Sequence, residues 1–455
     1  LLDFQAQLSH QTGRFERAQL VLGDSKANLS QPDFSIEVKL AQAELVPWFE
    51  LLQPMLSSRS ESSLLPPLQR ARGRIETVQL PQQLALTNTV FDLTNDSKGW
   101  QLQLNGAELA SRWQFSHAWR TEGIQIQLDY LHLPLADKAV TEQETAVAMA
   151  EPEAELAAQS WLTEMVPLRL SCNDCSVGPY RFGKVALQAA GSGQNWQLTE
   201  LVSDYKGNRF VLQGDWQPDA DLGRSQFSGN FSSPNLGALL TEYELTTAIS
   251  GSRSELEFQL SWQGAPQQFR LKSLQGQVKF ALGEGSLTEV SDQGARLFSI
   301  FSLNSLLRKL RLDFRDVFAK GFFYNRMTGN LSLDQGVAQT SDFLIDGVPG
   351  NMQLQGYADL VKRQIDYQVS FSPKVTSSLP VIIAWMVNPA TGLAALALDE
   401  VFQSAEVISR INFTVTGSFD KPVVTEVNRH STEVPVPVRI AQPENRQDDS
   451  RQPLL

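Results

Sequence analysis

The sequence is dominated by a two-residue alternation of apolar and polar side chains. Successive side chains of a β-strand point to opposite faces of the sheet, so this alternation predicts strands with one apolar and one polar face. Glycines follow or end several runs, at Gly106, Gly264, Gly283 and Gly417, and these suit tight turns between antiparallel neighbours. We therefore expect a mainly β protein built as a long antiparallel meander. The clearest runs are residues 100–104, 124–128, 256–262, 278–282, 365–371 and 411–415.

The alternation leaves two architectures open. An apolar strand face can be buried between two packed sheets, or it can line an open groove, and a period of two is the same in both cases. The residues alone favour the closed core. Hydrophobic residues make up 42% of the 455, which is enough for either.

Composition and motifs exclude several function classes. The net charge of −12 argues against nucleic-acid binding, which needs a basic surface. The four histidines, His10, His117, His132 and His430, are isolated from one another, and no nucleophile motif or phosphate-binding loop occurs. We expect no catalytic residue, no cofactor and no metal, and we do not expect an enzyme.

The two cysteines, Cys172 and Cys175, lie in the sequence SCNDCS. A zinc site would need two further ligands at suitable spacing. A local disulfide in an oxidising compartment is the favoured interpretation, with two free thiols as the alternative.

Breaks in the alternation suggest how the chain is organised. It begins without Met or an apolar leader, so we expect any signal or membrane anchor to lie upstream. We predict a β-rich segment with a short helix near 45–57, an acidic, alanine-rich linker or insert, a second β-rich segment with helical elements at 296–320 and 379–409, and a disordered tail. Their boundaries are 1–135, 136–160, 161–428 and 429–455, respectively.

The segment 296–320 is an amphipathic, basic helix in this interpretation. Its apolar residues recur every three or four positions, and the segment contains six basic and two acidic side chains. Such a stripe must lie on the sheet, on a membrane interface or on a partner. The residues concerned are Leu303, Leu306, Leu307, Leu310, Phe314 and Phe318 on the stripe, and the basic Arg308, Lys309 and Arg311.

A second segment, around 379–398, is strongly hydrophobic. No charged residue occurs between Lys374 and Asp399, but Pro380, Pro389 and Gly392 interrupt the run. We predict a hydrophobic hairpin that dips into a membrane interface or caps the sheet, in preference to a membrane span. Its residues are Val381, Ile382, Ile383, Trp385, Met386, Asn388 and Pro389.

Two long stretches resemble a known family. The segment GEGSLTEVSDQGARLFSIFSLNSLLRKLRLDFRDVFAKGFFYNRMTGNLSLDQG and the segment DYQVSFSPKVTSSLPVIIAWMVNPATGLAALALDEVFQS are similar to the C-terminal part of the YhdP group of AsmA-like proteins. The resemblance covers about residues 100–427, is most specific over 283–422, and is only general in style over residues 1–99. TamB and the eukaryotic bridge-like lipid transfer proteins are relatives of this family.

The resemblance implies a fold and a function. It implies a U-shaped, taco-like sheet whose apolar groove guides phospholipid acyl chains across the periplasm. The inner-membrane anchor would lie outside this chain, and the outer membrane surface or an outer-membrane protein would be the partner at the far end. The alternative to this function is a closed β-scaffold that tethers or assembles outer-membrane components through its C-terminal helices. The groove candidates are Leu256, Phe258, Leu260, Val278, Phe280, Leu282, Ile365, Tyr367, Val369, Phe371, Ile411, Phe413 and Val415.

Overall fold

The structure is a computed structural model of the whole chain, and it describes the larger part of it. The described residues are 2–11, 13–29, 33–45, 47–48, 56, 65–80, 84–134, 162–219, 223–245, 249–287, 322–374, 404–419 and 421–435.

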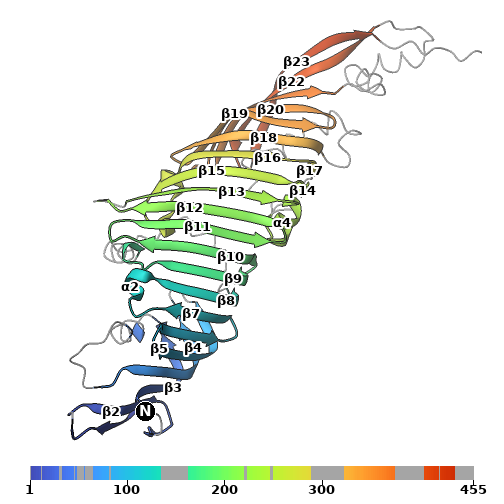
Figure 1. Cartoon of the computed structure of the whole chain (residues 1–455). Coiled ribbons are helices and arrows are strands. Elements are labelled where there is room, and N and C mark those ends of the chain that lie inside the picture. Colours follow the sequence, from blue (N-terminus) through green and yellow to red (C-terminus); the bar gives the residue numbers. More distant parts are fainter. Residues whose placement is uncertain are drawn as a thin grey trace, which may run out of the picture.

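The described residues form one sheet of 23 strands that climbs along the molecule in chain order (Figure 1). The mainly β expectation is confirmed. The strands are β1 (Leu2–Leu8), β2 (Phe15–Leu22), β3 (Asp33–Glu44), β4 (Leu68–Gln79), β5 (Ala85–Asp96), β6 (Gly99–Asn105), β7 (Leu109–Phe115), β8 (Ile124–Leu133), β9 (Leu168–Val177), β10 (Tyr180–Gly191), β11 (Trp196–Tyr205), β12 (Asn208–Gln217), β13 (Arg224–Ser233), β14 (Ile249–Gly251), β15 (Ser254–Gln263), β16 (Gln275–Leu282), β17 (Gly285–Leu287), β18 (Phe322–Asp334), β19 (Val337–Gly347), β20 (Gly350–Asp359), β21 (Gln364–Pro373), β22 (Ser404–Ser418) and β23 (Pro422–Pro435).

Nearly every strand pairs with the strands next to it in sequence. The exceptions surround the short β14 and β17, which pair with each other, so that β13 pairs with β15 and β16 with β18. The described strands β1 and β23 occupy opposite ends, so the sheet is open and is not two facing sheets (Figure 1). The closed-core interpretation was therefore wrong in expecting two packed sheets, because the described strands form one sheet.

Three junctions are parallel, and all the others are antiparallel. They join β2 to β3, β3 to β4 and β8 to β9. A parallel neighbour requires a connection long enough to return to the starting end of the strand, and these three connections are among the longer ones. The predicted linker at 136–160 falls in the connection between β8 and β9, outside the described residues. Because β8 and β9 are hydrogen-bonded neighbours, the sheet continues across that connection.

Helical structure is sparse in the described residues. The helical elements with defined bounds are α2 (Trp119–Glu122), α4 (Leu236–Glu242) and two 3-10 turns, η2 (Pro266–Gln268) and η3 (Leu271–Ser273). The side chain of Asn235 caps α4 by accepting a hydrogen bond from the amide N–H of Ala238 at 3.0 Å. Of the short helix expected near 45–57, residues 45, 47, 48 and 56 are described, and they are helical.

Two expected boundaries were wrong at the C-terminal end. Residues 404–409 were assigned to a helical element and 429–435 to a disordered tail, yet they belong to β22 and β23. The physical reason is their mutual pairing. The pairing of β22 with β23 continues from Ile411 and Arg429 out to Ser404 and Pro435. A short run of residues does not by itself distinguish helix from strand, so the sequence did not show this pairing.

Candidate functional site: a continuous apolar face

Strand register joins the apolar side chains of the sheet into one face. Directly paired residues in a sheet project to the same side, so a chain of pairs traces a row across neighbouring strands. One such row crosses sixteen strands from β1 to β18, and each member is apolar or glycine. We call it the apolar row: Phe4, Leu20, Ile36, Ala71, Leu93, Leu102, Trp113, Ile126, Leu170, Leu187, Leu201, Leu212, Gly229, Phe258, Val278 and Leu331.

The same face continues to β22. Met327 of β18 pairs with Ile345, which pairs with Met352, and this row then reaches Phe371 and Ile411. All thirteen residues proposed from the sequence as groove candidates project from this face, on β15, β16, β21 and β22. Sequence reasoning missed the members on β1–β13, because the runs at 100–104 and 124–128 signal strands but not their alignment.

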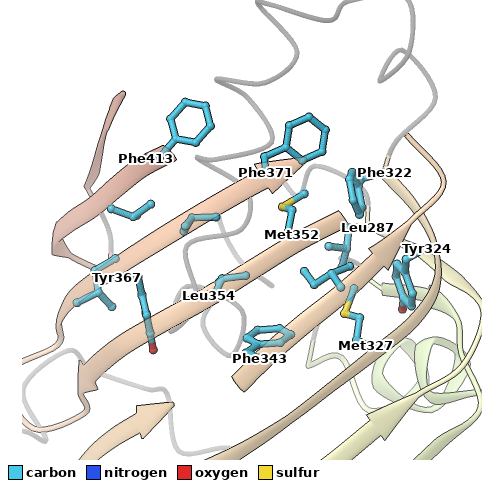
Figure 2. Packing of buried hydrophobic residues seen from close by; sticks show 14 of the residues in the cluster. Leu287, Phe322, Tyr324, Met327, Phe343, Met352, Leu354, Tyr367, Phe371 and Phe413 are labelled. Atoms are coloured by element: carbon cyan, nitrogen blue, oxygen red, sulfur yellow. The ribbon is translucent and has the colours of Figure 1, made fainter. Parts of the chain in front are cut away.

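The exposure of this face changes along the molecule. From Leu170 to Leu331, every member of the apolar row is partly exposed. Towards the C-terminal end the candidates on β21 and β22 are at most 3% exposed. They belong to a cluster with Phe322, Phe343 and Met352, whose side chains stand together on the strands in Figure 2. The apolar row is thus partly exposed over β9–β18, whereas the apolar side chains of the cluster on β19–β22 are buried.

Aromatic residues and connecting segments cover one flank of this face. Trp196, Trp216 and Phe227 form a buried cluster with Leu162 and Ala265, which lie outside the strands. The indole N–H of Trp196 donates to the Met165 sulfur at 3.2 Å, and that of Trp262 donates to the carbonyl oxygen of Ala265 at 3.3 Å. These contacts satisfy the donors of Trp196 and Trp262. The fully buried indole N–H of Trp216 has no hydrogen-bond partner among the described residues.

Three glycines of the apolar face lie beneath phenylalanine rings. Gly229 pairs with Phe258, Gly214 with Phe227, and Gly329 with Phe280. A Cβ on Gly229 would lie 2.8 Å from the Phe258 ring and 2.2 Å from the carbonyl oxygen of Val211. Each phenylalanine ring therefore occupies the space that a side chain on the glycine would fill. The ring covers the glycine, so the face stays apolar at that position.

The titratable groups with shifted pKa values differ between the apolar and the polar face. On the apolar face the shifted groups are tyrosines: burial raises the pKa of Tyr324 and of Tyr367, so both stay neutral at ordinary pH. On the polar face, hydrogen bonds from the backbone N–H and side chain of Asn330 lower the pKa of Asp342. Among the described residues no group of three or more His, Cys, Asp or Glu side chains could hold a metal ion.

The structure joins Cys172 and Cys175 in a disulfide on the apolar face, with an S–S distance of 2.06 Å. Cys172 pairs with Leu128 and Cys175 with Leu131 of β8. At this place β8 contains an extra residue relative to β7, and β9 contains one relative to β10. Between the two cysteines, the Asp174 carboxylate oxygen Oδ2 lies 3.0 Å from Nε2 of His132, at hydrogen-bond distance. The bridge thus fastens a bulge shared by two strands.

The two predicted helical segments lie outside the described residues. This concerns the stripe Leu303, Leu306, Leu307, Leu310, Phe314 and Phe318 with Arg308, Lys309 and Arg311, and the hairpin residues Val381, Ile382, Ile383, Trp385, Met386, Asn388 and Pro389. Within the part of the chain that the structure describes, helices are too short or too polar to cross a membrane.

Comparison with known proteins assigns the chain to a family. The family described as "YhdP protein" matches residues 1–424. The chain belongs to the YhdP family. This match extends to the N-terminal strands, where the sequence resemblance was only general, and it agrees with the continuation of the apolar row to β1.

A curated member of the YhdP family is similar to the chain. The Escherichia coli (strain K12) protein named "Intermembrane phospholipid transporter YhdP" is 28% identical over 263 residues, which are 57% of this chain and 21% of that protein. The matched region thus spans about a fifth of the length of this relative. No solved structure matches the chain.

Proposed function

We propose that this chain is part of a bridge that carries phospholipid between the two membranes of the Gram-negative envelope, with acyl chains lying on its apolar face. The observation that carries the proposal is the unbroken apolar row. With neighbouring strands ~4.8 Å apart, sixteen strands give a path of about 70 Å. The name of the E. coli relative, an intermembrane phospholipid transporter, supports the same role.

The physical requirement for such transport is exclusion of water from the acyl chain. At about 0.8 kcal/mol per methylene, a chain of about fifteen methylenes costs ~12 kcal/mol to expose fully. Each step along the partly exposed stretch of the row, from Leu170 to Leu331, exchanges one apolar contact for an equivalent one, so no single step carries this cost. The proposed role needs no catalytic group and no cofactor.

The location of the chain is also part of the proposal. We place it in the periplasm, in the C-terminal, outer-membrane-proximal part of the bridge, with the inner-membrane anchor elsewhere in the full-length protein. The outer membrane surface or an outer-membrane protein is the partner proposed for its C-terminal end. The basic stripe at 296–320 and the hairpin at 379–398 stay predictions from sequence for elements that contact the membrane or end the groove.

Photo-crosslinking tests the proposal directly. A photoreactive amino acid at Phe258 or Val278 in the full-length protein should capture phospholipid in cells, because these side chains are partly exposed on the apolar face. The matched control is Gln259, the next residue of β15, which projects from the opposite face. Equal lipid capture at Gln259 and Phe258 would contradict transport along the apolar face.

A further inference from the structure

A hollow of about 740 Å³ lies on the polar face over β12–β19. Four members of the apolar row also contribute to its lining, namely Gly229, Phe258, Val278 and Leu331. The polar lining residues of β12, β13, β15, β16 and β18 alternate with the apolar row along their strands, so their side chains project to the opposite face. Register pairs connect six of these side chains across six strands. We call them the polar row: Gln213, Ser228, Gln259, Gln277, Ser332 and Gln339.

The polar row offers repeated, unused hydrogen-bonding groups. The side chains of Gln259, Gln277 and Gln339 form no hydrogen bond with any described residue, and all three are exposed. Gln213 forms only a long bond of 3.4 Å from its amide to the Ser228 hydroxyl. Each amide presents two donors and one acceptor, and each serine hydroxyl can donate and accept. The hollow therefore displays neutral donors and acceptors every ~4.8 Å over about 24 Å.

The charges in the hollow disfavour anionic ligands. Among the described residues that line it, Lys279 is the one cation, and Glu257 and Asp342 are the two carboxylates. The Asp342 carboxylate already accepts hydrogen bonds from the backbone N–H of Asn330 at 2.9 Å and from its side-chain amide at 2.5 Å. Phosphate-bearing polymers and lipid headgroups need a net positive site, which this is not.

Peptides are also a poor match for this surface. Extended peptides bind at a free strand edge or through apolar side chains seated in pockets. The strands under the hollow are paired on both sides, and the polar row contains no apolar side chain. A linear ligand that bonds through many neutral groups fits better than one that needs a few apolar anchors.

We propose that the hollow binds a neutral linear polysaccharide, whose hydroxyl and amide groups exchange hydrogen bonds with the polar row. Tyr357 extends the row by one strand, since it pairs with Gln339, and it is 43% exposed. Its ring offers a flat apolar surface on which the face of a sugar ring can stack. Because acyl chains would use the opposite face, both ligands can be bound at once, and this inference does not rest on lipid transport.

Calorimetric titration of the full 455-residue chain with a linear N-acetylglucosamine hexamer tests this inference. We expect saturable binding that weakens about tenfold in the double variant Gln259→Ala/Gln277→Ala, since two amide contacts are lost. The matched control is Gln101→Ala/Gln114→Ala. These two residues are also paired and exposed on the polar face, on β6 and β7, but lie outside the hollow.

The contradicting results are specific. Absence of saturable binding, equal weakening in both double variants, or equal competition by an extended Ser/Gln peptide would each overturn the polysaccharide site. Thermal unfolding of each variant shows whether the fold is kept. Lipid capture at Phe258 should be unchanged in the Gln259→Ala/Gln277→Ala background, so failure of lipid transport and failure of the polysaccharide site give different results.

Discussion

At the residue scale, the apolar face depends on where glycine is placed as much as on where large side chains are placed. Gly214, Gly229 and Gly329 each lie beneath a phenylalanine of the adjoining strand. A glycine inside a strand normally weakens it, because the residue loses more backbone entropy and packs no side chain. Here the ring of the partner supplies the missing contact.

Substituting Gly229 tests this arrangement. The Gly229→Val variant should lower the free energy of unfolding by about 2 kcal/mol or more, because its Cβ would collide with the Val211 carbonyl and the Phe258 ring. Chemical denaturation measures the change. The neighbouring Ser228→Ala, on the polar face, serves as the control and should change stability by less than about 0.5 kcal/mol. Equal stability of the Gly229→Val and wild-type proteins would show that the ring does not need this space.

At the element scale, the strands could be predicted from the sequence, but their neighbours could not. The runs at 256–262, 278–282, 365–371 and 411–415 fall in β15, β16, β21 and β22, because alternation is a local property. Register and parallel junctions depend on long-range pairing and on the lengths of connections, which alternation does not encode. Among the glycines expected at turns, Gly106, Gly264 and Gly283 directly follow strands, whereas Gly417 lies inside β22.

The β22–β23 pair has a third strand beside it along only part of its length. Residues 411–417 of β22 pair with both β21 and β23, whereas residues 404–408 and 410 pair with β23 alone, and the pair extends past the sheet (Figure 1). A two-stranded ribbon is marginally stable in water. Amides of residues 405–409 should therefore exchange hydrogen much faster than those of residues 411–415, as measured by hydrogen–deuterium exchange. Uniform protection along β22 would contradict this expectation and would point to a further partner for the ribbon.

At the whole-molecule scale, the candidate path is collective. The sequence indicates which residues of β15, β16, β21 and β22 are apolar, but the row across sixteen strands exists only once every register is fixed. A single wrong register would turn a whole strand's apolar residues to the other face. This explains why the path as a whole could not be read from residues, although the family resemblance implied a groove.

A charge placed in the middle of the row should interrupt the path. Leu212→Asp in the full-length protein should strongly reduce transfer of labelled phospholipid between the two membranes, because an acyl chain would have to pass a desolvated carboxylate. Gln213→Asp, the adjacent residue on the polar face, is the matched control and should leave transfer unchanged. Full transfer by a folded Leu212→Asp protein would show that lipid does not travel along this row.

The pairing of nearly every strand with its sequence neighbours has a consequence for how such proteins change in evolution. Gain or loss of one antiparallel hairpin alters the path by about 10 Å and leaves the facing of every other side chain intact. The length of the sheet is then set by the number of hairpins, so in the proposed bridge the reach adjusts in small increments to the distance between the two membranes.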